Sequence, residues 1–145
     1  MLTLLLACLV LPTGVRPTAL ACSASDVPMQ GPLEIGVQCS GSVSLSGFPA
    51  GDVDLFVTNH GATGTLAVTY EVHCTYANGF TQSILQLERQ LLGPGESTVQ
   101  FVIFPISERA GLGTATVTAT ARAKVVGSEG PFFSVDDSCT FTLVP

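Results

Sequence analysis

Residues 114–125 are the part of this sequence that most restricts how the chain can fold. Alanine and valine occupy every second position there, and threonine, arginine and lysine fill the positions between them. Successive side chains of a strand point to opposite faces of its sheet, so a period of two predicts a β-strand with one buried face. Because the inner residues are small, a second sheet can approach this face closely. The segment therefore predicts a long strand in a layered β structure.

The same alternation recurs along the chain. It is clearest over residues 65–76, where Leu66, Val68 and Cys74 share one phase and mainly threonine, glutamate and histidine fill the other. This pattern is typical of a half-buried antiparallel strand. The remaining predicted strands cover residues 33–45, with a bend at Gly41, and residues 52–57, 83–92, 97–104 and 139–143.

Residues 83–92 fit two structures. Their leucines alternate as in a strand, but Ser83 with Gln86 resembles a helix capping box, and Gly93-Pro94 would end a helix. We favour a strand, because Asn78-Gly79 is the preferred pair for a tight two-residue hairpin turn. Such a turn would fold this segment back beside residues 65–76.

Residues 97–104 are apolar on both faces. Val99, Phe101 and Ile103 share one phase, and Val102 and Phe104 share the other. A strand that is apolar on both sides is typical of a buried place within a sheet. The pattern therefore predicts a central strand.

Seven strands at regular spacing, separated by Gly, Pro and Asn turns, predict an all-β fold. We expect one domain over residues 33–145, an immunoglobulin-like antiparallel β-sandwich of about seven strands. A parallel α/β fold is disfavoured, because no stretch of crossover-helix length recurs between the strands.

The N-terminal residues have the pattern of a signal peptide. An apolar run over residues 2–11 is too short to span a bilayer, and Ala19-Leu20-Ala21 supplies a small-residue cleavage site. We therefore predict a signal peptide over residues 1–21, a connector over residues 22–32, and a secreted or surface-exposed chain with no membrane span after cleavage. The run lacks a preceding Lys or Arg, so a wrongly assigned gene start or an incomplete gene product stays an alternative.

Four cysteines remain once Cys8 leaves with the signal peptide. An even number in an exported domain favours two disulfides, and Cys22, Cys39, Cys74 and Cys139 allow three pairings, which stay open. In an alternative reading, Ala-Leu-Ala-Cys is a lipobox and Cys22 is the acylated first residue of a lipoprotein.

The charge of the chain argues against nucleic acid as a partner. Without Arg16 the expected mature chain has four basic and eleven acidic residues, a net charge of −7. Affinity for a phosphate backbone requires clustered Lys and Arg. The acidic excess can serve solubility alone.

No residue pattern indicates catalysis, a cofactor or a metal. His73 and Cys74 are adjacent, but neighbours on a strand face opposite ways, so they cannot act as base and nucleophile. His60 stands in a turn without a nearby acidic residue in the sequence. Two acidic pairs, Asp52 with Asp54 and Asp136 with Asp137, could supply oxygen ligands to calcium. A calcium site stays an alternative, although neither pair has the ligand spacing of an EF-hand.

Several short motifs carry a family resemblance. They are Asn59-His60-Gly61, residues 70–74, residues 92–97, Phe101 and residues 139–143. Together they resemble CARDB-type adhesion modules of bacterial surfaces and the third, membrane-proximal domain of the hapless gamete-fusion family. The second resemblance implies a structural domain of a class II-like fusogen, although the chain lacks that family's fusion loop, elongated domains and membrane anchor.

We therefore expect a non-enzymatic secreted or surface module for interaction or adhesion. The Thr-rich outer face of residues 114–125 and the loops of the sandwich offer binding surfaces. Its protein partner and oligomeric state stay open. The alternative is a structural domain or fragment of a gamete-fusion protein.

Overall fold

The computed structural model of this chain describes residues 29–145. The predicted signal peptide over residues 1–21 and the cysteine at position 22 lie outside this part. The described residues form nine strands and no helix. The strands are β1 (Met29–Gln30), β2 (Leu33–Cys39), β3 (Ser42–Ser44), β4 (Ala50–Asn59), β5 (Leu66–Thr75), β6 (Thr81–Leu92), β7 (Ser97–Pro105), β8 (Gly113–Val125) and β9 (Phe133–Val144).

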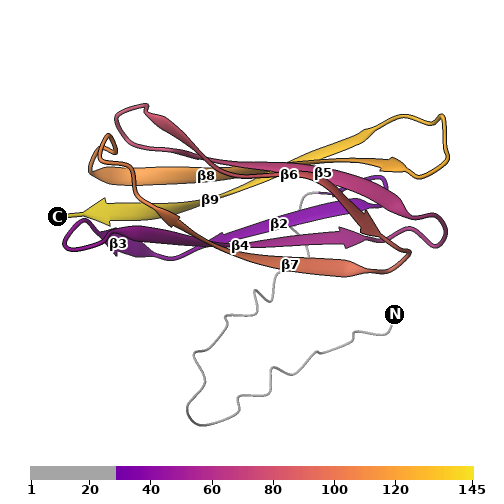
Figure 1. Cartoon of the computed structure of the whole chain (residues 1–145), viewed down its shortest axis with the longest axis horizontal. Helices are drawn as coiled ribbons and strands as arrows, with labels where there is room; N and C mark the ends of the chain where they lie inside the picture. The colour runs from indigo at the N-terminus through magenta and orange to yellow at the C-terminus, as the bar shows by residue number, and fades with distance from the viewer. Residues whose placement is uncertain (1–28) are drawn as a thin grey trace, which may run out of the picture.

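The strands form two sheets packed face to face (Figure 1). Sheet A has the order β1-β2-β4-β7, and sheet B has the order β3-β9-β8-β5-β6. The fold is an immunoglobulin-like β-sandwich, which confirms the predicted fold class. β1 lies within residues 22–32, the predicted connector, and pairs with β2 at the margin of sheet A.

The first predicted strand is divided between the two sheets. β2 pairs with β4 in sheet A, whereas β3 pairs in parallel with β9 in sheet B. The chain crosses at Ser40 and Gly41, the position of the predicted bend, and Gly41 accepts a backbone hydrogen bond from Thr142. One pairing in the sandwich is therefore parallel rather than antiparallel. The alternation of apolar and polar residues cannot reveal that the segment is divided between two sheets, because the same phase points inward in both β2 and β3.

The core lies between the sheets, and β8 supplies its smallest members. Ala115, Ala119 and Ala121 are fully buried on the inner face of β8, as the alternation predicts. β8 lies between β9 and β5 in sheet B. Larger side chains complete the core from β2 and β4 in the opposite sheet and from β5 beside β8; the fully buried ones include Leu33, Ile35, Leu55, Val57, Val68 and Tyr70.

Residues 83–92 lie in β6, which confirms the strand interpretation. β5 and β6 form the predicted antiparallel hairpin, but the connection is longer than a two-residue turn. Gly79 donates to the carbonyl of Tyr76 over 2.8 Å, and Tyr76 donates to the carbonyl of Phe80 over 2.9 Å. Gly79 has a φ of 82°, a left-handed conformation that favours glycine. The Asn-Gly pair therefore lies within a five-residue loop, residues 76–80, rather than forming a two-residue turn by itself.

The predicted central position of residues 97–104 is wrong. β7 pairs only with β4 and forms the edge of sheet A. Its apolar residues on one phase face the core, and those on the other phase face outward. The apolar residues on both faces led to the wrong position, because they show which side chains a strand could bury and not which strands pair with it.

Candidate interaction surface

The outer face of β7 is an exposed apolar strip. Val99, Phe101 and Ile103 are 60%, 62% and 65% exposed, and Phe56 of β4 lies opposite Val99 at 37% exposure. We call these four residues the β7 strip. Isolated apolar side chains are common on protein surfaces, but contiguous apolar groups mark sites of interaction.

Packing beneath β7 determines which residues form the strip. The Phe104 ring lies against Gly51, directly opposite in the register of β4 and β7, where a Cβ would overlap it. Phe104 also meets Phe141 of sheet B in an edge-to-face contact with ring centroids 6.2 Å apart. With Phe104 held inward, Phe101 and Ile103 must point outward, because a shift of one residue would reverse every side chain.

Carboxylates border the β7 strip on one side. Asp52 and Asp54 lie on the outer face of β4, opposite Ile103 and Phe101 respectively. β7 itself carries no charged residue. The sequence shows this lack of charge, but only the strand order shows that the uncharged strand lies at an edge.

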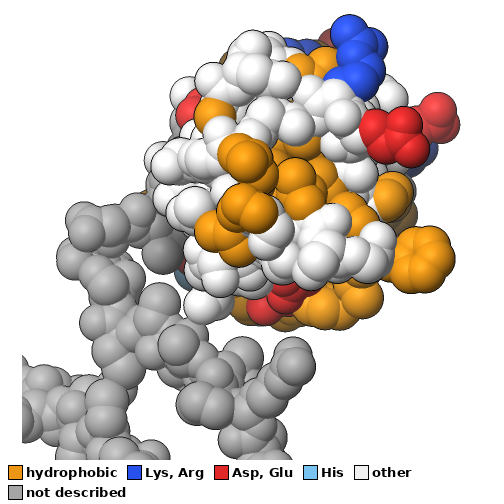
Figure 2. All heavy atoms as spheres, turned by 90° about the vertical axis from the view of Figure 1, so that its left-hand side faces the viewer, with side chains coloured by type: hydrophobic (Ala, Val, Ile, Leu, Met, Phe, Trp, Pro, Cys, Tyr) orange, Lys and Arg blue, Asp and Glu red, His pale blue; other side chains and the backbone are white. Residues whose placement is uncertain are grey.

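A second apolar area covers one end of the sandwich. Figure 2 views the end where β9 finishes and β8 begins, and hydrophobic side chains gather across it. Phe48 is fully exposed in the β3–β4 loop, and Leu112 is half-exposed before β8. The loops here are tied together, because Asn78 donates to the carbonyl of Arg109 over 2.8 Å, and the Arg109 guanidinium lies 4.5 Å from the centre of the Phe80 ring. Phe48 and Leu112 lie in loops, whereas the β7 strip lies along paired strands.

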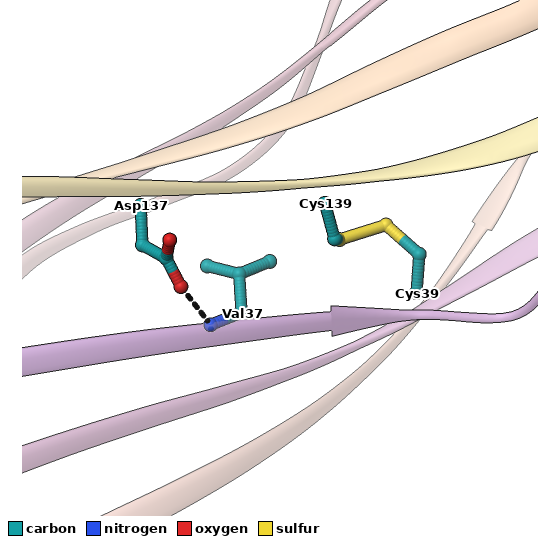
Figure 3. The surroundings of a disulfide bond; sticks show 4 residues. All are labelled: Val37, Cys39, Asp137 and Cys139. Carbon is teal, nitrogen blue, oxygen red and sulfur yellow. Dashed lines mark hydrogen bonds between the residues drawn. A yellow bond between two sulfur atoms is a disulfide. The ribbon is translucent and has the colours of Figure 1, made fainter. Parts of the chain in front are cut away.

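One disulfide joins the two sheets. Cys39 at the end of β2 bonds to Cys139 of β9, with their Cα atoms 5.7 Å apart (Figure 3). Beside it, the backbone N–H of Val37 donates to Asp137 Oδ2 over 2.9 Å. Both links hold β2 of sheet A against β9 of sheet B. Among the three pairings that the sequence allows, Cys39–Cys139 belongs to the one that would also join Cys22 to Cys74, and Cys22 lies outside the described residues.

Among residues 29–145, Cys74 is a buried thiol without a disulfide partner. Cys22 lies outside the described residues, so a second disulfide stays a prediction. Cys74 lies on the inner face of β5, where Gln82 and Val117 are its neighbours in register. Its inward phase predicted burial correctly, but a disulfide also requires a second cysteine with its Cα within about 7 Å. Burial raises the pKa of the Cys74 thiol and the pKa of the nearby Tyr76 hydroxyl.

His73 and Cys74 face opposite sides of sheet B, as predicted. The His73 ring is exposed, and its Nε2 lies 3.6 Å from Glu71 Oε2 on the same outer face. His60 has an acidic neighbour that the local sequence could not reveal, because Glu34 reaches its Nε2 from β2. β2 and β4 are paired, which brings these residues together from 26 positions apart.

Asn59 is the buried polar residue among those described, and it has a structural role. Its Nδ2 donates to the carbonyls of Gly64, Leu92 and Gly93 at 3.0–3.1 Å, and its Oδ1 accepts from the Gly61 N–H over 2.9 Å. These bonds tie the β4–β5 loop to the end of β6. The motif Asn59-His60-Gly61 therefore stabilises the connection and does not form an open polar site.

The acidic pairs weighed for calcium do not come together. Asp52 and Asp54 lie on the outer face of sheet A, whereas Asp137 faces the interior from β9 and Asp136 faces outward. Within residues 29–145, no group of three or more His, Cys, Asp or Glu residues could hold a metal ion. A hollow of about 30 Å³ lies beside Thr69, Glu71 and Arg122, room for about one water molecule, far below the size of a ligand pocket.

Among residues 29–145, no helix is long and apolar enough to cross a membrane. No protein-family model matches the chain, and no curated protein matches it.

Several solved structures resemble this sandwich. The CARDB domain of the PF1109 protein of Pyrococcus furiosus, solved with two metal ions, has 15% sequence identity and a TM-score of 0.55 over 82% of this chain and 90% of that one. The putative ApaA protein of Bordetella pertussis has 16% identity and a TM-score of 0.54 over 77% of this chain and 95% of that one. A DNA glycosylase of Pseudomonas fluorescens, AlkC, has 14% identity and a TM-score of 0.53 over 79% of this chain but only 31% of its own.

Each of these proteins contains a region with the fold of this chain. At such identities the likeness shows the fold alone, and a fold of this kind serves many functions. The resemblance to CARDB modules is confirmed at the level of the fold. An adhesion role and the resemblance to the gamete-fusion domain stay predictions.

Proposed function

We propose that this chain is a non-enzymatic interaction module, secreted or displayed at a cell surface, which binds a protein partner through the β7 strip. The exposure of Val99, Phe101 and Ile103 on an edge strand carries this proposal. Apolar area removed from water contributes roughly 25 cal/mol per Å², and the free edge adds backbone hydrogen bonds to a partner strand. The same strand thus supplies both the apolar contact area and the backbone hydrogen bonds that would bind an added strand.

The disulfide supports an oxidising location. Cys39 and Cys139 are bonded between the two sheets, and such bonds persist in secreted proteins and are rare in the cytosol. This agrees with a signal peptide over residues 1–21.

Site-specific photo-crosslinking tests the binding surface. A photo-reactive benzoylphenylalanine takes the place of Phe101 in the β7 strip, and the matched control carries it in place of Thr69, an exposed residue on the outer face of sheet B. Cells that make the protein are irradiated, and adducts are separated by mass and identified. We expect a discrete protein adduct from position 101 and none from position 69. The absence of an adduct at 101, or equal adducts at both positions, would overturn the proposal.

A further inference from the structure

We infer that the partner of the β7 strip is a second copy of this chain, joined by antiparallel pairing of the two β7 strands about a two-fold axis at Phe101. The inference rests on the proposed function, because it uses the same surface. It predicts that sheet A of one copy continues into sheet A of the other.

β7 differs from the other sheet edges in having no protection against pairing. Natural proteins keep edge strands short or place charges and bulges on them. β1 has two residues and β3 has three. β6 is long, but it carries Glu88 and Arg89, and its pairing with β5 contains two irregularities. β7 has nine residues, no charge and an exposed apolar face.

The sequence of β7 is self-complementary about Phe101. In an antiparallel pair centred there, Phe101 faces its own copy and Val99 faces Ile103 of the partner subunit. Directly opposed residues on one face have Cβ atoms about 4.5–5.5 Å apart, so these side chains touch. The outer face of the two paired β7 strands is therefore a continuous row of β-branched and aromatic side chains.

Side chains of β6 bond the two ends of β7 and leave its middle free. Gln82 Nε2 donates to the Pro105 carbonyl over 2.9 Å, and Gln90 Nε2 donates to Thr98 Oγ1 over 3.0 Å. Between these points, β7 pairs with β4 alone. The free stretch is centred near Phe101, where the two-fold axis must pass.

The acidic charge of the chain permits edge pairing and opposes the packing of two strips face to face. At a joined edge, Asp52 and Asp54 on each β4 are separated from their copies by three strand spacings, about 14 Å. This exceeds the Debye length of about 8 Å at physiological salt, so their repulsion is screened. Face-to-face packing would bury the same carboxylates beside like charges, which is costly.

Sedimentation velocity of the purified full chain, from about 1 to about 200 µM, tests the pairing, since a joint of one strand pair is at the small end of specific interfaces. We expect reversible dimers in the wild type, monomers in Phe101→Lys, and dimers in the control Thr69→Lys. Circular dichroism checks that each variant is folded. If Phe101→Lys does not fold, Ile103→Thr replaces it, because that side chain is also exposed.

Oxidation of Phe101→Cys tests the register. Facing cysteines on the two-fold axis lie within disulfide range, so we expect a disulfide-linked dimer on non-reducing gels, and none from Thr69→Cys.

A wild type that stays monomeric at the highest concentration would overturn self-pairing, as would dimers that survive Phe101→Lys or a Phe101→Cys chain that forms no dimer. If the photo-crosslink at position 101 then contains a different protein, the interaction surface stands and the second copy is ruled out. If position 101 yields no crosslink in cells, both proposals fail.

Discussion

Loss of the disulfide between Cys39 and Cys139 is expected to be the largest single effect on stability. The bond joins residues 100 positions apart, and closing a loop of that length lowers the entropy of the unfolded chain by an amount worth about 4.7 kcal/mol at 25 °C. Measured effects are often smaller, so we expect the double variant Cys39→Ala/Cys139→Ala to lose about 3–5 kcal/mol. A domain of this kind is stable by only about 5–15 kcal/mol.

Urea unfolding followed by circular dichroism measures this loss. With a denaturant slope of about 2 kcal/mol per M, the midpoint should fall by roughly 2 M. The wild type under reducing conditions is the matched control, because it keeps both side chains and lacks only the bond. If the urea midpoints of the oxidised and reduced proteins differ by less than about 0.3 M, the expected stabilisation is refuted, because the bond would then not restrict the unfolded chain appreciably.

Three further outcomes follow from buried groups. Asn59→Ala should lower the free energy of unfolding in urea by at least about 3 kcal/mol, because it leaves carbonyls and an N–H without partners. The control Thr58→Ala, on the outer side of β4, should lower it by less than about 1 kcal/mol. Equal losses in the two variants would contradict the role of Asn59. Burial raises the pKa of Cys74, Tyr70 and Tyr76, so the folded state retains protons that the unfolded state releases, and stability should fall as pH rises above the thiol's ordinary value of 9.0. The decline is up to about 1.4 kcal/mol per pH unit for each group, and equal urea midpoints at pH 8 and pH 10.5 would count against it. Cys74 should resist maleimide in the native protein and react in urea, as read by intact mass, whereas rapid native labelling would show that the thiol is accessible.

The sequence predicted the local features of the fold well. The alternation over residues 114–125 corresponds to β8, and its alanines are buried as expected. Residues 83–92 were ambiguous, and the Asn78-Gly79 signal resolved them correctly as a strand. The opposite orientation of His73 and Cys74 also followed from the strand period. Each of these depends on neighbours in the sequence, which is the range over which periodicity and turn preferences act.

The errors concern relations between distant segments. The pattern of β7 indicated a buried central strand, and its place at the edge of sheet A depends on which strands pair with it. The sequence left the partner of Cys39 open, because an inward phase does not tell which other cysteine lies opposite. The contact of Glu34 with His60 depends in the same way on the pairing of β2 with β4.

The sequence by itself determined where apolar and polar residues alternate, where the chain turns, and which face of each strand is apolar. Only the tertiary structure decided the order of the strands, the crossing of residues 33–45 from one sheet to the other, and the disulfide between Cys39 and Cys139. The candidate surface belongs to the second group. The residues of the β7 strip are apolar in any fold, but they are exposed because they point to the outer face of sheet A, and no other part of the described chain covers them there. Whether a sheet face is buried depends on the layer that packs against it, which a local pattern does not encode.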